Sequence, residues 1–180
     1  ATDHPKMLLF APLAVSAGYL LLMQWPGYGG TAYIAGAFNP QQALQDIIDH
    51  RITAVMGVPV FLEGIASAPG FPEADLSHVQ VTSVGGARVT RELVDKWMSK
   101  GITLRQIYGQ TEVGGQCTIN PIDMVAIDPN KCGRGMPLTQ MKIVDPDGNQ
   151  LPAGQTGEIL VKGPGCMVGY WRDEEATRKT

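Results

Sequence analysis

Several kinds of ligand contact stand together at Tyr108-Gly109-Gln110-Thr111-Glu112, directly after the apolar run of residues 102–107. The apolar run predicts a β-strand, so the motif falls where a strand ends. The tyrosine ring offers a stacking surface, and the glycine lets a ligand approach the backbone. The threonine hydroxyl can bond a phosphate oxygen, and the carboxylate can hold a divalent cation.

A second glycine turn, Gly85-Gly86-Ala87, ends another apolar run at residues 79–84. Such a turn can join a strand to a helix without any ligand, so by itself it does not indicate a binding site. Together with the first motif it does. Ligands of open α/β sheets bind outside the carboxyl ends of strands, and two such ends predict a nucleotide site. The near-fingerprint Gly27-Tyr28-Gly29-Gly30-Thr31-Ala32 follows a predicted helix instead of a strand, which argues against a dinucleotide loop there.

The composition is that of a soluble globular protein, with 44% hydrophobic and 17% charged residues among 180. A net charge of -3, without a Lys/Arg cluster, argues against a nucleic-acid partner. Cys117, Cys132 and Cys166 lack C-x-x-C spacing, so we interpret them as reduced thiols without a metal or redox role. We therefore expect a cytoplasmic protein.

The uncharged stretch of residues 7–25 has the length of a membrane span. Pro12 and Gly18 interrupt it, and no basic flank follows. The apolar run also continues past a signal-peptidase-like Val15-Ser16-Ala17, which a cleaved signal would not do. We expect a strand at residues 7–10 and a buried helix after it, with no transmembrane segment.

Strand and helix signals alternate through the first two thirds of the chain. Residues 1–127 predict an α/β nucleotide- and acyl-binding subdomain, with a parallel sheet flanked by helices. Helices are expected to begin at Asn39-Pro40, at Pro59 and after Thr90, and the last one should turn Leu93, Val94, Trp97 and Met98 inward. Residues 128–180 predict a small antiparallel β-rich module, because Asp145-Pro146-Asp147-Gly148 is a strong turn signal between the apolar runs 141–144 and 158–161.

Further motifs follow the first two in order: Gly133-Arg134-Gly135-Met136-Pro137, the residues 157–163, and Gly169-Tyr170-Trp171. Together they resemble the adenylate-forming (AMP-binding) superfamily, which includes acyl-CoA synthetases, luciferases and the adenylation domains of peptide synthetases. The resemblance implies ATP- and magnesium-dependent activation of a carboxylic acid as an acyl-adenylate, followed by transfer to coenzyme A.

The resemblance also implies roles for individual residues. Thr111 would bond the α-phosphate and Glu112 would hold Mg²⁺, as the catalytic pair, and Tyr108 would pack against adenine. The remaining nucleotide-binding positions would be Gly86, Ala87, Arg88, Gly109 and Gln110. The acyl pocket would be lined by Val15, Gly57, Gly85, Ile107, Gly114 and Gly115.

Several family features are absent: an early phosphate loop with its lysine, the ribose-binding aspartate, the hinge, and the lysine-bearing C-terminal domain. We therefore expect this chain to be the middle of a larger synthetase, inactive by itself and prone to self-association. Val15 stands where the family often has a histidine or aromatic residue, and Ile107 where it often has a smaller one. The pocket should then be apolar, without a charged anchor, and the acid itself stays open.

Two other functions stay open. The first is an amino-acid adenylation domain of a peptide synthetase, which the lack of an acidic residue near Val15 or along residues 56–59 disfavours. The second is a non-catalytic nucleotide-binding module with a family-like surface. Adenylate formation by the full-length protein would separate the enzyme from the binding module.

Overall fold

A computed structural model describes residues 4–180 and contains one large and one small β-sheet. The large sheet has seven strands in the order β2-β1-β3-β4-β5-β6-β7. The first four neighbouring pairs are parallel and the last two are antiparallel. Its strands are β1 Lys6–Leu9, β2 Thr31–Ile34, β3 Ala54–Gly57, β4 Val81–Val84, β5 Arg105–Gln110, β6 Gly115–Ile119 and β7 Arg134–Gly135.

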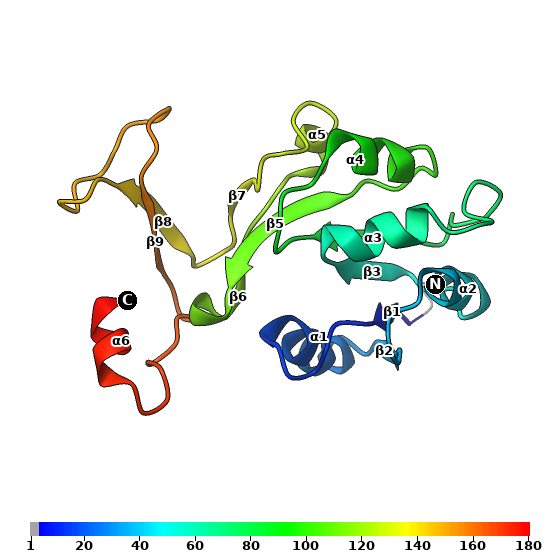
Figure 1. Ribbon diagram of the computed structural model, residues 1–180, viewed down its shortest axis with the longest axis horizontal. Helices are drawn as coiled ribbons and strands as arrows, with labels where there is room; N and C mark the ends of the chain where they lie inside the picture. Colours follow the sequence, from blue (N-terminus) through cyan, green and yellow to red (C-terminus); the bar gives the residue numbers. More distant parts are fainter. Residues whose placement is uncertain (1–3) are drawn as a thin grey trace.

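Helices cover both faces of the parallel part, as predicted (Figure 1). Helix α1 (Ser16–Gly27) lies on one face, and α2 (Pro40–Asp49), α3 (Pro59–Ala66) and α4 (Arg91–Met98) lie on the other. The chain steps outward from β1 to β2 and then passes back over β1 to β3. Because crossovers between parallel strands are right-handed, this reversal places α1 opposite the later helices.

The larger core lies beneath α2, α3 and α4, whose starts follow the predicted caps. Asn39 Oδ1 accepts the Gln42 N–H at 3.0 Å, and Thr90 Oγ1 accepts the Leu93 N–H at 3.2 Å. Met98 was predicted to face inward, but it is 37% exposed, because it lies at the margin of the helix face that buries Leu93, Val94 and Trp97. Buried residues of this core include Leu8, Leu44, Ile47, Val55, Leu62, Ile65, Leu93, Val94, Trp97 and Leu104.

The prediction of a buried helix after β1 is wrong, because α1 buries only one side. Tyr19 and Met23 are 55% and 58% exposed, and Gly18 is its one fully buried residue. Its inner side, with Leu22 and Trp25, packs against Met7 and other residues of β1 and β3. The helix is apolar all round, so the sequence carries no signal for the side that stays uncovered.

None of the helices within residues 4–180 is long and apolar enough to cross a membrane.

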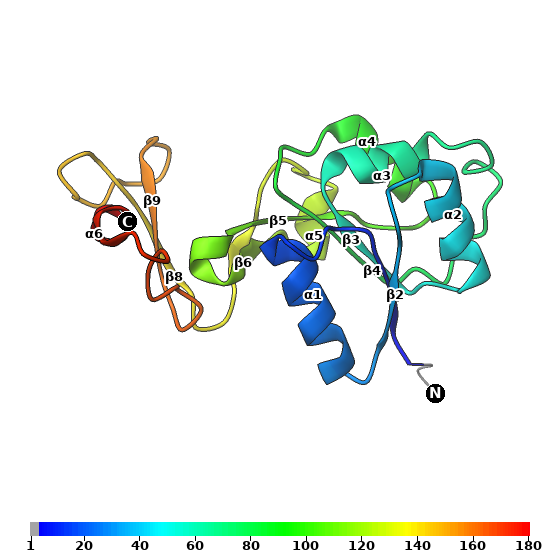
Figure 2. The same ribbon diagram turned by 60° about the horizontal axis from the view of Figure 1, so that its bottom comes forward.

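The sequence did not predict strand β6, which returns antiparallel to β5, or the short helix α5 (Ile122–Val125). The predicted hairpin is present as β8 (Gln140–Val144) and β9 (Glu158–Lys162), which pair antiparallel, and helix α6 (Glu174–Lys179) follows. Figure 2 shows β8, β9 and α6 set to one side of the large sheet. A division of the chain near residue 128 stays a prediction, and β7 extends the large sheet to Gly135.

Candidate functional site

The central motif lies on the connection between β5 and β6. Strand β5 continues to Gln110, two residues beyond Tyr108, so the first three residues of the motif are part of the strand instead of following it. The pairing register with β6 shifts between Tyr108 and Gly109, and such bulges re-aim side chains next to functional sites. Thr111 and Glu112 then begin a short 3₁₀ turn, η1 (Thr111–Val113), at the carboxyl end of β5.

The start of α1 lies against this turn. The Thr111 hydroxyl donates a hydrogen bond to Ser16 Oγ at 2.8 Å, and Ser16 is the first residue of α1, directly after Val15. Leu20, one turn further along α1, lies close to Gly115. The sequence analysis missed Ser16, because a lone serine between small apolar residues carries no signal for a contact 95 positions away.

Glu112 is held by the segment that leads into α6. Its Oε1 accepts the Tyr170 hydroxyl at 2.8 Å, and its backbone carbonyl accepts the Met167 N–H at 2.8 Å. A hydrogen bond from its own backbone N–H, and then the bond from Tyr170, lower the pKa of Glu112 below its usual value. The carboxylate is therefore an anion at neutral pH and can ligate a cation.

Two of the predicted pocket residues contact each other directly. Gly85 follows β4 and stands beside Ile107 of β5, because the register pairs Val84 with Gln106. A Cβ atom on Gly85 would lie 2.5 Å from Ile107 Cγ1, so the isoleucine side chain occupies the space over the glycine. The two residues form one surface on the α1 side of the sheet, since Ile107 alternates with the buried Gln106.

The other predicted pocket residues are spread along the same edge. Val15 is 49% exposed next to Ser16. Gly57 ends β3, and a Cβ there would lie 2.8 Å from a ring carbon of Phe10. In this strand order the connections lead away to opposite sides from the gap between β1 and β3. Ligands of doubly wound sheets bind at such a switch point. Gly57 therefore lies at the switch point, with an aromatic ring beside it.

The second glycine turn lies at the end of β4, the strand next to β5. Gly86 adopts a φ of 79°, a backbone conformation that favours glycine. Ala87 and Arg88 are exposed, and Arg88 Nε donates to Asn130 Oδ1 at 3.3 Å. The residues assigned to the adenine edge are thus exposed at the carboxyl end of β4, the strand next to the one that carries Tyr108.

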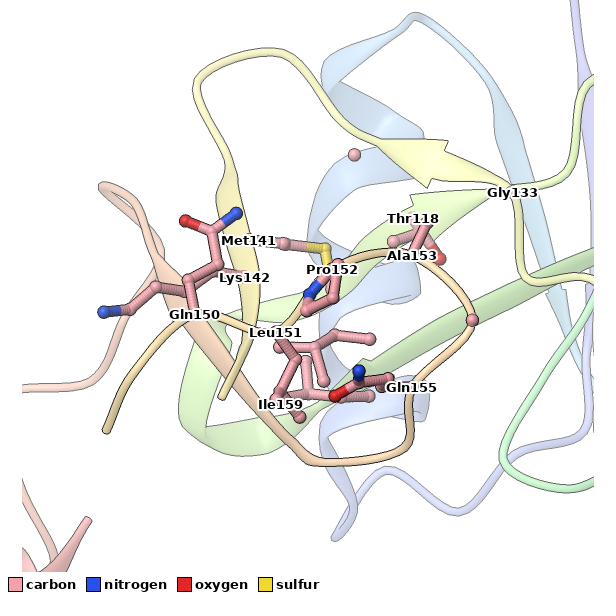
Figure 3. Close-up of a pocket in the computed structure, with 13 residues that line it drawn as sticks. Thr118, Gly133, Met141, Lys142, Gln150, Leu151, Pro152, Ala153, Gln155 and Ile159 are labelled. Carbon is pink, nitrogen blue, oxygen red and sulfur yellow. The ribbon is translucent and has the colours of Figure 1, made fainter. Parts of the chain in front are cut away.

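A hollow of about 810 Å³ borders the motif. Gln110, Glu112 and Val113 form one wall, and the rest is formed by residues of β8, β9, the segment 166–169 and the C-terminal residues from α6 onward. A smaller hollow of about 390 Å³ lies between β6, β7 and the β8–β9 hairpin, and it contains none of the predicted site residues. Figure 3 shows its lining, in which the apolar Leu151, Pro152 and Ile159 stand beside the polar Gln150 and Gln155. The first hollow reaches Glu112, and Thr111 is not among its lining residues.

The donor set determines which metal could bind at Glu112. Residues 4–180 contain no group of three or more His, Cys, Asp and Glu side chains that could hold a metal ion. Mg²⁺ commonly takes one or two protein carboxylates and completes its shell with substrate phosphates and water. One anionic carboxylate therefore fits a magnesium ion that arrives with a nucleotide, and does not fit a resident structural metal.

The chain is similar to ligases that form CoA thioesters. It is 34% identical over 151 residues to the feruloyl-CoA synthase of Amycolatopsis sp, covering 83% of this chain and 30% of that protein. It is 36% identical over 159 residues to 4-coumarate--CoA ligase 1 of Glycine max, covering 83% and 53%. The chain thus spans between about a third and a half of the length of these two relatives.

Solved structures show the same fold. The amide bond synthetase McbA from Marinactinospora thermotolerans superposes with a TM-score of 0.89 at 30% identity, over 100% of this chain and 36% of that one. The N-terminal domain of FACL13 from Mycobacterium tuberculosis gives a TM-score of 0.91 at 24% identity, over 99% and 45%. The family model for AMP-binding enzymes matches residues 1–171, and the chain belongs to this family.

Proposed function

We propose that the full-length protein is an AMP-forming acyl-CoA synthetase. It would activate a carboxylic acid with ATP, release pyrophosphate, and transfer the acyl group from the adenylate to coenzyme A. The observation that carries the proposal is the η1 turn, where the Thr111 hydroxyl and the Glu112 carboxylate stand together at the carboxyl end of β5. The relatives named feruloyl-CoA synthase and 4-coumarate--CoA ligase support the ligase class.

The nucleotide would lie along the edge formed by β4 and β5. The Tyr108 ring would stack on adenine, and Gly86, Ala87 and Arg88 would border its edge, with Gly109 and Gln110 close by. The Thr111 hydroxyl donates to Ser16 Oγ in the structure, and it would bond the α-phosphate by turning its proton from Ser16 to a phosphate oxygen. Adenylyl transfer needs charge stabilisation at the phosphates more than covalent help from the protein, so such fixed polar groups carry the catalysis.

Glu112 would hold the magnesium ion that accompanies ATP. The bound ion supplies positive charge that offsets the charge developing on the phosphates. Glu112 is suited to this position because it is anionic and its side chain is already anchored by Tyr170.

The acyl group would lie against Val15, Gly57, Gly85, Ile107, Gly114 and Gly115. None of these side chains is charged, so the pocket favours an aliphatic or simple aromatic acid over an amino acid, whose amine would need an acidic anchor. The Ile107 side chain covers Gly85 and narrows this surface.

Pyrophosphate exchange with the full-length enzyme over a panel of carboxylic acids tests the proposal. Glu112→Gln keeps the shape and removes the charge, and we expect it to lower kcat about 100-fold or more at saturating Mg²⁺. Glu73→Gln, a change at an exposed carboxylate in the loop after α3, is the matched control and should keep full activity. Near-normal turnover of Glu112→Gln would show that the metal role is wrong.

The names of the similar proteins indicate different acceptors for the activated acyl group. McbA carries the name of an amide bond synthetase, so an amine acceptor is the second candidate. Coenzyme A or a primary amine is added to the acyl-adenylate formed on the enzyme. Measuring which of the two reacts with the adenylate decides between a thioester and an amide product. Residues 1–180 alone should form no adenylate above background, since the chain spans 30% of the feruloyl-CoA synthase.

A further inference from the structure

The segment of residues 163–171 runs along the η1 turn and contacts it at three points. The Met167 N–H donates to the Glu112 carbonyl, and the Tyr170 hydroxyl donates to Glu112 Oε1, both at 2.8 Å. The backbones also meet closely, because a Cβ on Gly114 would lie 2.6 Å from the Gly165 carbonyl oxygen. Both the main chain and the side chain of Glu112 are thus tied to one segment of the β-rich module.

Helix α6 fixes Tyr170 in turn. The Tyr170 N–H donates to Thr177 Oγ1 at 2.8 Å, and the Thr177 hydroxyl donates to the Asp173 carbonyl at 2.7 Å. Asp173 caps α6 by accepting the Ala176 N–H at 2.9 Å. Gly169, with a φ of 149°, leaves room for Thr177, since a Cβ there would lie 2.7 Å from its methyl carbon. The backbone of Tyr170 is therefore held in place by its hydrogen bond to α6.

We propose that Tyr170 is a positioning residue that orients the Glu112 carboxylate for magnesium-bound ATP. The inference rests on the proposed metal role of Glu112. A free glutamate side chain loses rotamer freedom when it binds a cation, and the bond from Tyr170 removes part of that freedom beforehand. A carboxylate has about four lone-pair positions, so one hydrogen bond leaves others for the metal. Gly169-Tyr170-Trp171 thereby gains a role in the site.

Tyr170→Phe in the full-length enzyme removes the hydroxyl and keeps the ring. Mn²⁺ binding in the presence of ATP, followed by electron paramagnetic resonance, reads the metal site without turnover. We expect the Mn²⁺ dissociation constant to rise about tenfold, in line with the loss of one hydrogen bond to a charged group. The apparent KM for Mg²⁺ should rise similarly, with most of kcat recovered at saturating Mg²⁺. Tyr28→Phe, the same change at a 74% exposed tyrosine, should alter neither value.

A double-mutant cycle separates positioning from a general structural role. In a Glu112→Gln background, Tyr170→Phe should weaken Mn²⁺ binding no further, because both changes act on one carboxylate. Additive losses would overturn the inference, and so would tighter Mn²⁺ binding by Tyr170→Phe, which would mean that the phenol competes with the metal. If Glu112→Gln weakens binding and Tyr170→Phe does not, only the positioning role falls. If Glu112→Gln has no effect, the proposed metal role falls and the inference with it.

Discussion

Gly85→Ala should destabilise the sheet at the acyl surface, because the new methyl group meets Ile107. The added Cβ would lie 2.5 Å from Ile107 Cγ1 and 3.1 Å from the Ile107 carbonyl oxygen. Overpacking of this kind costs about 1–3 kcal/mol. Gly85 is not among the residues with positive φ, so alanine would recover about 0.4–1 kcal/mol from the unfolded chain. The net loss should be about 1–2 kcal/mol, which lowers Tm by about 2–8 °C in a chain of this size.

Thermal unfolding of the wild type, Gly85→Ala, Ile107→Ala and the double variant measures this loss and its origin. Ile107→Ala removes Cγ1, so Gly85→Ala should cost little in that background, with a coupling energy of about 1–2 kcal/mol. Gly36→Ala adds the same methyl group where no atom lies within 4 Å and φ is not positive, so it should raise Tm by about 1–4 °C through the unfolded chain alone. An equal cost of Gly85→Ala with and without the isoleucine side chain would refute the contact.

Three further outcomes are expected. Gly109→Ala should prevent the β5–β6 connection from forming, because its Cβ would overlap the Gly115 carbonyl; a variant that folds with wild-type Tm contradicts this. Hydrogen bonds, first from the Asn149 backbone, lower the pKa of Asp145, so the stability it contributes is present above the unfolded pKa of about 3.9 and is lost as pH falls through the lower folded value. The Tm difference between wild type and Asp145→Asn should therefore close at acid pH, and a difference that persists at about pH 2 would count against it. The uncovered side of α1 should make residues 1–180 self-associate, and light scattering of a clean monomer at high concentration would exclude this.

The parallel part of the fold could be predicted because its signals are local. The strand predicted at residues 52–58 is rich in β-branched residues and uncharged, and β3 forms within it at 54–57. The caps at Asn39 and Thr90 precede apolar helical faces. Strand β6 could not be predicted in the same way. It has five residues, of which only Ile119 is large and apolar, and it begins at the second glycine of the pair Gly114-Gly115, so the sequence resembles a loop until β5 provides the partner.

The candidate site was predictable as a set of motifs, but not as a set of contacts. The residue types around Thr111 and Glu112 indicate phosphate and metal chemistry without any structure. The partners of these two side chains are Ser16 and Tyr170, which lie 95 and 58 positions away in the sequence. Periodicity and spacing report on neighbours within one element, so contacts over such distances appear only when the chain is folded.

Close backbone and side-chain contacts within the protein explain why glycine stands at several motif positions, without any ligand. Gly109 allows the Gly115 backbone to approach, Gly114 allows Gly165 to approach, and Gly85 leaves space for Ile107. These contacts join β4, β5, β6 and the 163–171 segment, so they hold the η1 turn between the large sheet and the β-rich module. The geometry of Thr111 and Glu112 therefore depends on close backbone packing around them, and substitution at a motif glycine should disturb the proposed catalytic pair through the protein even where no ligand touches the glycine.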